Sequence, residues 1–436
     1  MKNKSKQKAV SILTNFTSEN LTNFSGIAPI YTFMHKLGLP QYFNTISIKL
    51  GANAKYETST ILSMLVLGLS SGMNRISKME SFSRDSLVRK LFRIKGKIDE
   101  DTIANRINRF GMAQTEELLT INSLSSAKVH EVLGTTKDIL DIDSTVRTVF
   151  GSQEGASKGY NPKKHGAKSY HALLCFLNST KECLSSWLRP GNAYTSNNAP
   201  EFMKQVFSLL PSRIEELLVR CDSGFFSGSL MDVLESRPKT EYIIKVKLKN
   251  FINLMQGRTW ETFDSELGLQ TTEFQYRAQS WSVSRKLVVL RKITSIETEG
   301  LLYPKINYEY FCYVTNIEDS PLQIHSLYGD RGESENWIEA VKNQMFAGSL
   351  LTQNFWTNEA FWLLSVMAYN VSVWMRKLID SKTWKEEPMT FRMWFIQIAG
   401  KVIESGRRTY LKMSKNNYYK ERWLILEKKI DDLVFL

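Results

Sequence analysis

The chain has 436 residues, of which 42% are hydrophobic and 23% charged, a balance typical of globular proteins with two or three domains. Its 23 glycines and 10 prolines are too few for a collagen-like or disordered chain, and its four cysteines include no Cys-x-x-Cys pair that would indicate a thiolate zinc site. The basic start lacks the apolar core of a signal peptide, and no apolar run reaches the roughly 20 residues that span a bilayer. We therefore expect a cytoplasmic protein without a membrane segment.

The charge indicates a polyanionic partner. Lys and Arg number 57 against 44 Asp and Glu, a formal net charge of +13. The excess lies near both ends, because residues 1–135 hold 18 basic and 10 acidic side chains and residues 371–436 hold 14 and 8. Nucleic acid is the simplest partner for such a chain. The charge alone is equally consistent with a basic protein that has no such partner.

The first region is predicted to be helical after a Lys-rich tail at residues 1–8, which we expect to be disordered. The segment 99–110 opens with acidic residues and a threonine, which suit a helix N-terminus. It then carries Arg106 and Arg109 on a polar face opposite an apolar one. These arginines are candidates for DNA contact, and an ordinary solvated surface is the alternative.

From about residue 137 the pattern changes to alternating, β-branched segments separated by helical ones. Strands are predicted at 139–150, 170–177, 183–188, 217–222 and 242–246, and helices at 201–210 and 226–236. This order indicates a mixed α/β sheet. Residues 250–325 carry further alternating segments that predict an inserted antiparallel sheet, and helical patterns follow at 333–346, 358–378 and 390–405.

Two acidic residues are predicted to lie where strands end. Asp143 belongs to the first strand and Asp222 closes the fourth, and the carboxyl edge of a strand is a common place for a ligand-binding group. Each acid alone could be a helix cap or a turn residue. Together with Glu335 they form an oxygen-only set that suits two Mg²⁺ or Mn²⁺ ions rather than zinc.

Glu335 belongs to a group of side chains with helical spacing. Separations of three, four and seven residues place four of them within roughly a 60° arc of a helix: Tyr328, Arg331, Glu335 and Lys342. A carboxylate on this face can hold a metal ion, and the two cations can hold phosphate oxygens. Glu339 shares the face and is the alternative metal ligand.

These motifs, in this order, resemble a known family. The sequence is similar to the DDE transposases of bacterial insertion sequences, in the group with a Y-x2-R-x3-E-x6-K signature. Residues 328–342 match the signature at all four positions, residues 141–145 resemble the first-aspartate strand and residues 219–225 the second. The resemblance spans about residues 25–415 and includes three further segments: 159–164, 368–370 and 405–408.

The resemblance implies a domain organisation around an α/β, RNase H-like catalytic domain. This domain would comprise residues 136–248 and 326–378, with the β-rich insertion at 249–325 between its two parts. A helical DNA-binding region at 1–135 would precede it. A basic helical region at 379–436 would follow.

The resemblance also implies that Asp143, Asp222 and Glu335 form a catalytic triad that holds two Mg²⁺ ions, for which Mn²⁺ can substitute. Asp141 lies two residues before Asp143 and points to the same side of the strand, so it is the alternative first acid. The Asp-Ser-Thr match favours Asp143.

The activity implied is in-line phosphoryl transfer on double-stranded DNA, in which transposon ends are cleaved and joined to target DNA. Arg331 and Lys342 would contact backbone phosphates, and Tyr328 a phosphate or a distorted nucleotide. Trp281, beside two cations in the insertion, is a candidate platform for an unpaired base. Cutting two ends together implies a homodimer on DNA, in a bacterial cytoplasm close to the nucleoid.

Two alternatives stay open at this point. The first is an RNase H-type nuclease that does not join strands. The second is a transposase-derived DNA-binding protein that has lost catalysis, against which the three acids argue.

Overall fold

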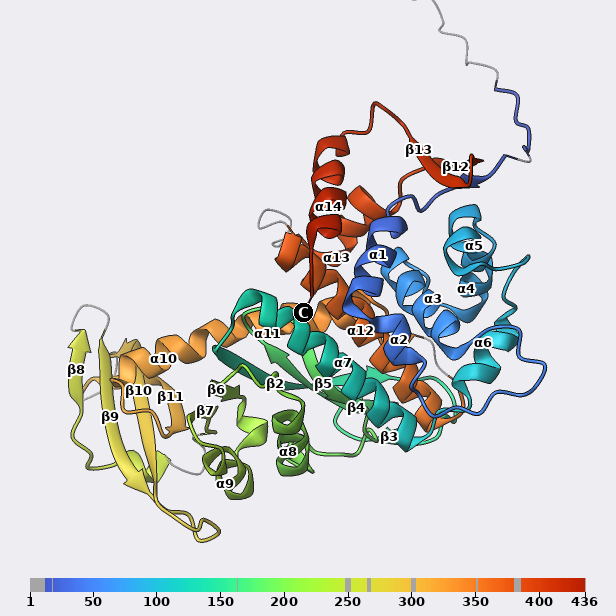
Figure 1. The fold of residues 1–436 in the computed structure, drawn as a ribbon. Coiled ribbons are helices and arrows are strands. Elements are labelled where there is room, and N and C mark those ends of the chain that lie inside the picture. Colours follow the sequence, from blue (N-terminus) through green and yellow to red (C-terminus); the bar gives the residue numbers. More distant parts are fainter. Residues whose placement is uncertain are drawn as a thin grey trace, which may run out of the picture.

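The computed structural model describes residues 12–17, 19–162, 164–247, 252–264, 268–298, 303–349, 352–379 and 386–435. Figure 1 shows helices from both ends of the chain on one side of a central sheet and an extended group of strands on the other. The Lys-rich tail lies outside the described residues.

The N-terminal region is helical, as predicted. After the short strand β1 (Leu21–Thr22) its described helices are α1 (Ile27–Leu37), α2 (Leu39–Phe43), α3 (Thr58–Ser71), α4 (Ile76–Ser83), α5 (Ser86–Phe92), α6 (Glu100–Ile107) and α7 (Met112–Leu133). Helix α3 is apolar on all sides and almost wholly buried, because it packs between α2 and the long helix α12 (Phe355–Ile379). The N-terminal helices therefore share one hydrophobic core with the rest of the chain.

The central sheet is mixed, which confirms the predicted fold class. Its strands are β2 (Lys137–Thr148), β3 (Ser157–Lys158), β4 (Lys168–Leu177), β5 (Cys183–Trp187), β6 (Glu216–Cys221) and β7 (Thr240–Lys245), and helices α8 (Ala199–Leu209) and α9 (Gly228–Ser236) connect the later strands. Strand β4 pairs antiparallel with β2, β3 and β5, whereas β6 pairs parallel with both β2 and β7. Helices α7 and α12 pack together and both contact β5. The parallel strands β2, β6 and β7 therefore end at one edge of the sheet.

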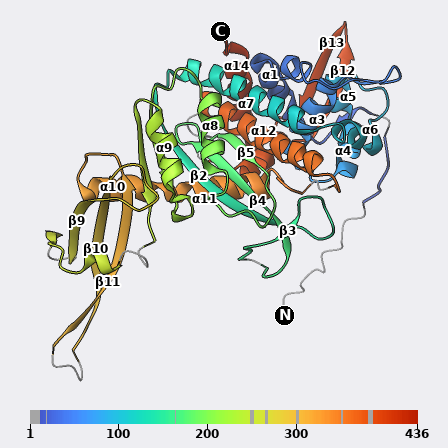
Figure 2. The ribbon, with the colours of Figure 1, turned by 90° about the horizontal axis from the view of Figure 1, so that it is seen from below.

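The insertion continues this sheet. Its described strands are β8 (Glu261–Asp264), β9 (Leu269–Tyr276), β10 (Arg285–Glu297) and β11 (Lys305–Thr315), paired antiparallel in sequence. Strand β11 pairs antiparallel with β7, so a continuous path of strands runs from the central sheet into the insertion. These strands project away from the body of the molecule (Figure 2). Helix α10 (Pro321–Gly329) packs on β9 and β10 over a second, smaller core.

The C-terminal part is less helical than predicted. It contains α11 (Glu333–Glu339), α12, α13 (Pro388–Phe391), β12 (Gly400–Ser405), β13 (Arg408–Met413) and α14 (Lys420–Asp432). The predicted helix at 390–405 is wrong in its second half, where β12 pairs with β1 and β13. Gly406 and Arg407 both have a positive φ and form the hairpin turn, and a short β-branched run before such a turn favours a strand. No described helix combines the length and apolar character that a membrane crossing requires.

Candidate catalytic cleft

Asp143 lies on β2 beside the parallel strand β6. Its Oδ2 atom lies 3.0 Å from Nη2 of Arg331, and its Oδ1 atom accepts a 2.7 Å hydrogen bond from the backbone amide of Ser144. Burial raises the pKa of Asp143, the Arg331 guanidinium opposes the shift and the Asp222 carboxylate adds to it. The same carboxylate raises the pKa of Arg331, although burial by itself lowers it. Asp143 and Arg331 therefore form a largely buried ion pair at the sheet edge.

Asp141 lies on the same side of β2 but inside the core. Neither its side chain nor that of Arg220 is exposed, and the two form a bidentate ion pair with N–O distances of 2.7 Å. Arg220 also donates a 2.7 Å hydrogen bond to the carbonyl oxygen of Leu327. Asp141 is thus occupied by a structural partner and does not line the cleft, whereas Asp143 does.

Asp222 directly follows β6 and caps a 3₁₀ turn, where its Oδ1 atom accepts a 2.9 Å hydrogen bond from the amide of Gly224. In the sheet, Ile142 on β2 is paired with Cys221 on β6. The next residue of each strand is one of the two acids, so both carboxylates lie at the same carboxyl edge.

The signature residues lie on consecutive helical segments rather than on one regular helix. Helix α10 ends at Gly329, a 3₁₀ turn spans Asp330–Gly332, and α11 passes into a π-helical turn at Ala340–Gln344. These segments nevertheless bring all four predicted side chains to the same cleft: Tyr328, Arg331, Glu335 and Lys342.

The two cations of the signature are bonded to β2. Arg331 is 8% exposed and donates a 3.0 Å hydrogen bond to the carbonyl oxygen of Ile142, besides its contact with the first acid. Nζ of Lys342 donates to Oγ1 of Thr145 at 2.7 Å and to the carbonyl oxygen of Val146 at 3.1 Å. Both side chains therefore fix the helical segments to the strand that carries Asp143.

The insertion reaches the cleft at two points. The rings of Tyr328 and Tyr313 are 4.9 Å apart, and burial raises the pKa of Tyr328 to about 12. Lys245, the last residue of β7, lines the cleft and is the strand partner of the same Tyr313 on β11. The cleft is therefore built from the central sheet, the signature helices and the first turn of contact with the insertion.

These residues enclose an open cleft of about 640 Å³. Besides the predicted residues, its lining contains Ser144, Thr145, Ser223, Lys245, Ile338, Glu339 and Asn343. Glu339, the alternative metal ligand, is therefore present beside Glu335. Within the described ranges, no three His, Cys, Asp or Glu side chains are close enough together to enclose a metal ion.

Lys245 is the cleft residue that the sequence analysis missed. It closes the strand parallel to the one that ends at Asp222. The rule that directed attention to acids at carboxyl strand ends would have found this cation had it been applied to basic residues as well.

Two of the predicted DNA contacts lie outside the cleft, and one is a core residue. Arg106 is 7% exposed and donates hydrogen bonds of 2.9 Å to Oγ1 of Thr58 and to the carbonyl oxygen of Tyr56. It does not share a solvated face with Arg109, which is exposed and donates to the carbonyl oxygen of Lys49. The expected Asn/Arg face is wrong for Arg106, because the segment before α3 covers this side of α6.

Trp281 is packed inside the molecule. It is 4% exposed, and its ring lies 5.6 Å from the rings of both Phe226 and Tyr276. A Cβ atom added at Gly228 would lie 2.8 Å from this indole. The ring joins the insertion to α9 and presents no open face to a base, so the stacking role stays a prediction without support from this geometry.

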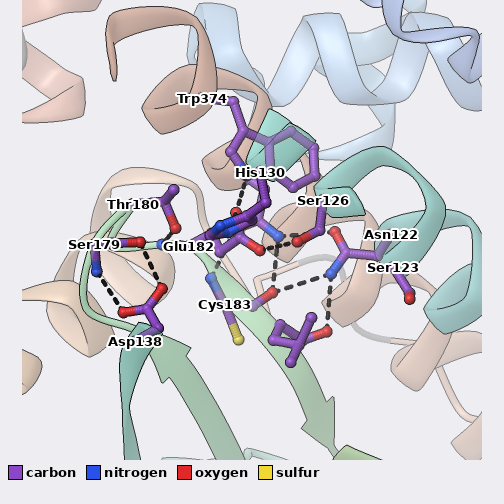
Figure 3. A network of polar contacts seen from close by, with 12 residues as sticks. Asn122, Ser123, Ser126, His130, Asp138, Ser179, Thr180, Glu182, Cys183 and Trp374 are labelled. Carbon is purple, nitrogen blue, oxygen red and sulfur yellow. Dashed lines mark hydrogen bonds and ion pairs between the residues drawn. The ribbon is translucent and has the colours of Figure 1, made fainter. Parts of the chain in front are cut away.

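A buried polar network fixes α7 and α12 to the β4–β5 turn (Figure 3). Glu182 is fully buried and accepts hydrogen bonds from Ser126 and Trp374, and Nε2 of His130 lies 3.6 Å from it. Burial alone would raise the pKa of Glu182, but His130 and the two hydrogen bonds hold it below its ordinary value. The network explains how two polar helices can pack on the sheet.

Asn370 gives the similar segment 368–370 a structural role. Its Oδ1 atom accepts a 2.8 Å hydrogen bond from the amide of Cys183, and its Nδ2 atom donates at 2.8 Å to the carbonyl oxygen of Cys183 and to Oδ1 of Asn122. One amide thus satisfies both backbone groups of a residue on β5.

Acids at the ends of adjacent parallel strands, faced by a helical glutamate and cations, form the architecture expected of a DDE transposase. The sequence comparison shows this class directly, because residues 4–434 match the family model of the transposase DDE domain group 1. The chain belongs to that family, and it is a DNA transposase by family.

Solved structures of transposases share parts of this fold. The synaptic complex of piggyBac transposase with hairpin DNA is 14% identical, with a TM-score of 0.46 over 86% of this chain and 81% of that one. The paired-end complex of Mos1 transposase with the left transposon end is 10% identical, with a TM-score of 0.19 over 48% of this chain and 64% of that one. A Mos1 mariner paired-end complex with Mn is also 10% identical, with a TM-score of 0.18. Among curated proteins none matches the sequence significantly.

Proposed function

We propose that this transposase binds the terminal inverted repeats of an insertion sequence, cleaves the ends and joins them to target DNA. One observation carries the proposal: Asp143 and Asp222 reach the same sheet edge, and Glu335 lines the same cleft from a helix. Cations at the rim of an acidic centre suit a phosphodiester substrate, because they can pair with the phosphates on either side of the reacting one.

The donor set fits a hard divalent cation, because its ligands are all carboxylate oxygens. Asp143, Asp222 and Glu335 would hold two Mg²⁺ ions, replaceable by Mn²⁺, and the bound ions would stabilise charge on the attacking and leaving oxygens. The carboxylates lie around an open cleft rather than a closed cage, which suits ions that share their ligands with a phosphate.

The remaining cleft residues would position the DNA. Lys245 and Lys342 offer cations to backbone phosphates from two sides of the acids. Arg331 is largely buried against Asp143, so its main task would be to orient that carboxylate. Double-stranded DNA as the partner agrees with the net charge of +13. Cutting two ends together calls for a homodimer on DNA.

The test uses short duplexes that carry the inverted repeats found beside the gene. Asp143→Ala, Asp222→Ala and Glu335→Ala should each abolish Mg²⁺-dependent cleavage and leave binding of the duplex nearly unchanged. Glu339→Ala is the matched control, since it removes a carboxylate from the same cleft and should keep cleavage. Normal cleavage by a triad variant would remove that residue from the site.

Metal and strand-transfer assays separate this proposal from its alternatives. Cleavage should be lost in excess EDTA and restored by Mg²⁺ or Mn²⁺, whereas Ca²⁺ should support binding without cutting. The wild-type protein should also join a pre-cut end to a target plasmid. Cleavage without joining would make the chain a nuclease, and binding without cleavage would make it a DNA-binding protein only.

A further inference from the structure

The loop between β5 and α8, residues 190–198, holds an exposed aromatic ring beside the cleft. Tyr194 is 73% exposed, so packing within the protein does not account for its ring. Its neighbour Thr195 contacts the strand of the first acid, since its Oγ1 atom lies 3.2 Å from Oγ of Ser144, which directly follows Asp143.

The same threonine packs against the second acid-bearing segment. A Cβ atom added at Gly224 would lie 3.0 Å from Cβ of Thr195 and 3.0 Å from Oδ1 of Asp222. Tyr194 is therefore one residue away from a side chain that touches both acid-bearing segments.

A buried cation fixes the backbone of this loop. Arg189 is 6% exposed and donates hydrogen bonds to the carbonyl oxygens of Tyr194 at 3.1 Å and Asn197 at 2.6 Å, and to that of His171 at 3.1 Å. No carboxylate in the described part of the chain pairs with it, and burial lowers the pKa of Arg189 to about 10. Burying a cation without an acid costs stability, so the position of Tyr194 is held against an energetic penalty.

A second loop interlocks with the first and adds positive charge. A Cβ atom added at Gly159 would lie 1.9 Å from the carbonyl oxygen of Gly191, so the two backbones are in direct contact. The next residue, Tyr160, is 72% exposed. Residues 157–168 contain several lysines and no acid. A ring and a basic loop together resemble the surfaces that bind single-stranded nucleic acid.

We infer that Tyr194 stacks on an unpaired nucleobase of the DNA end, next to the phosphate that reacts in the cleft. The inference rests on the proposed function and adds a nucleobase site to it. Bases inside a duplex already stack on their neighbours, so an isolated ring at this position selects an unpaired one. Every base has a π-face, so the contact tolerates any sequence, while the lysines of residues 157–168 meet the backbone.

The experiment measures binding of the full-length protein, in EDTA, to an end duplex whose two terminal nucleotides are unpaired and carry 2-aminopurine. Wild type and Tyr194→Trp should bind this end and change its fluorescence. Tyr194→Ala should bind it about tenfold more weakly and lose the fluorescence change, as expected for loss of a stacking contact worth about 1.4 kcal/mol. Binding of the fully paired duplex should not change.

Tyr303→Ala is the control, because Tyr303 is 78% exposed near the far end of the β10–β11 hairpin, away from the body (Figure 2). Equal effects of the two alanine variants would overturn the inference, and so would a Tyr194→Ala protein with wild-type affinity and fluorescence. If wild type cleaves normally but shows no fluorescence change, the stacking site is wrong and the proposed function stands. If wild type binds neither duplex, the proposed function itself fails.

Discussion

Replacing Asp141 with asparagine should destabilise the protein strongly, although Asp141 is only two residues from Asp143. The change keeps the shape of the side chain but leaves Arg220 as a fully buried cation without its acid. Removal of one partner from a buried ion pair costs about 3–5 kcal/mol, because the remaining charge stays desolvated. Both hydrogen bonds of the pair are 2.7 Å long, so the full cost is expected here. Asp143→Asn, at the partly open cleft, should change the free energy of unfolding by no more than about 1 kcal/mol.

Urea unfolding followed by tryptophan fluorescence measures both values, and cleavage of the end duplex is assayed on the same preparations. Asp141→Asn should unfold at lower urea and cleave when folded, whereas Asp143→Asn should unfold like wild type and not cleave. In the double variant Asp141→Asn, Arg220→Met the unpaired charge is gone, so part of the lost stability should return. A stable Asp141→Asn protein without cleavage would refute this reasoning and make Asp141 the first acid.

Three further predictions concern other buried polar groups. Burial raises the pKa of Glu359 from 4.5 to about 7, so its ionisation opposes folding as pH rises through this window; in urea titrations Glu359→Gln should be about 3 kcal/mol more stable than wild type at alkaline pH and no more stable below pH 4.5. Asn370→Leu should lower the free energy of unfolding by about 3 kcal/mol in the same titration, because both backbone groups of Cys183 lose their partner. Arg331→Gln should shift the pH profile of single-turnover cleavage to higher pH, because Arg331 lowers the pKa of Asp143, and Arg331→Lys should shift it less; an unshifted profile in Arg331→Gln would show that the ion pair does not control the acid.

Local patterns were sufficient to predict how the cleft residues come together. Asp143 and Asp222 could be placed because alternation marks their strands, and parallel strands deliver their carboxyl ends to one edge. Helical spacing likewise brought Glu335 to the same place, even though the helix is interrupted. The contact of Lys342 with Thr145 had no sequence signal, since it depends on a π-helical turn.

Residues whose environment is set by distant segments were not predictable. Arg106 occupies a polar position on its own helix, yet the chain at Thr58 covers it. Trp281 stands beside cations in the sequence, but packing between the insertion and α9 determines its exposure. The strand at Gly400–Ser405 forms because β1, from the other end of the chain, supplies a pairing edge. Tertiary partners of this kind override local propensity.

The seam between β7 and β11 makes the insertion a lever on the cleft. Only three residue pairs join the two strands in the described sheet, and one of them is Lys245 with Tyr313. The ring of Tyr313 also rests on Tyr328, so both cleft residues are attached to the same point of the long β10–β11 arm. Because the arm extends far beyond this seam (Figure 2), a small turn of its outer end would displace Lys245 and Tyr328 together, while Asp143 stays fixed on β2. Whatever grips the outer end of the arm can thus adjust the cations and the phenol of the cleft without moving its acids.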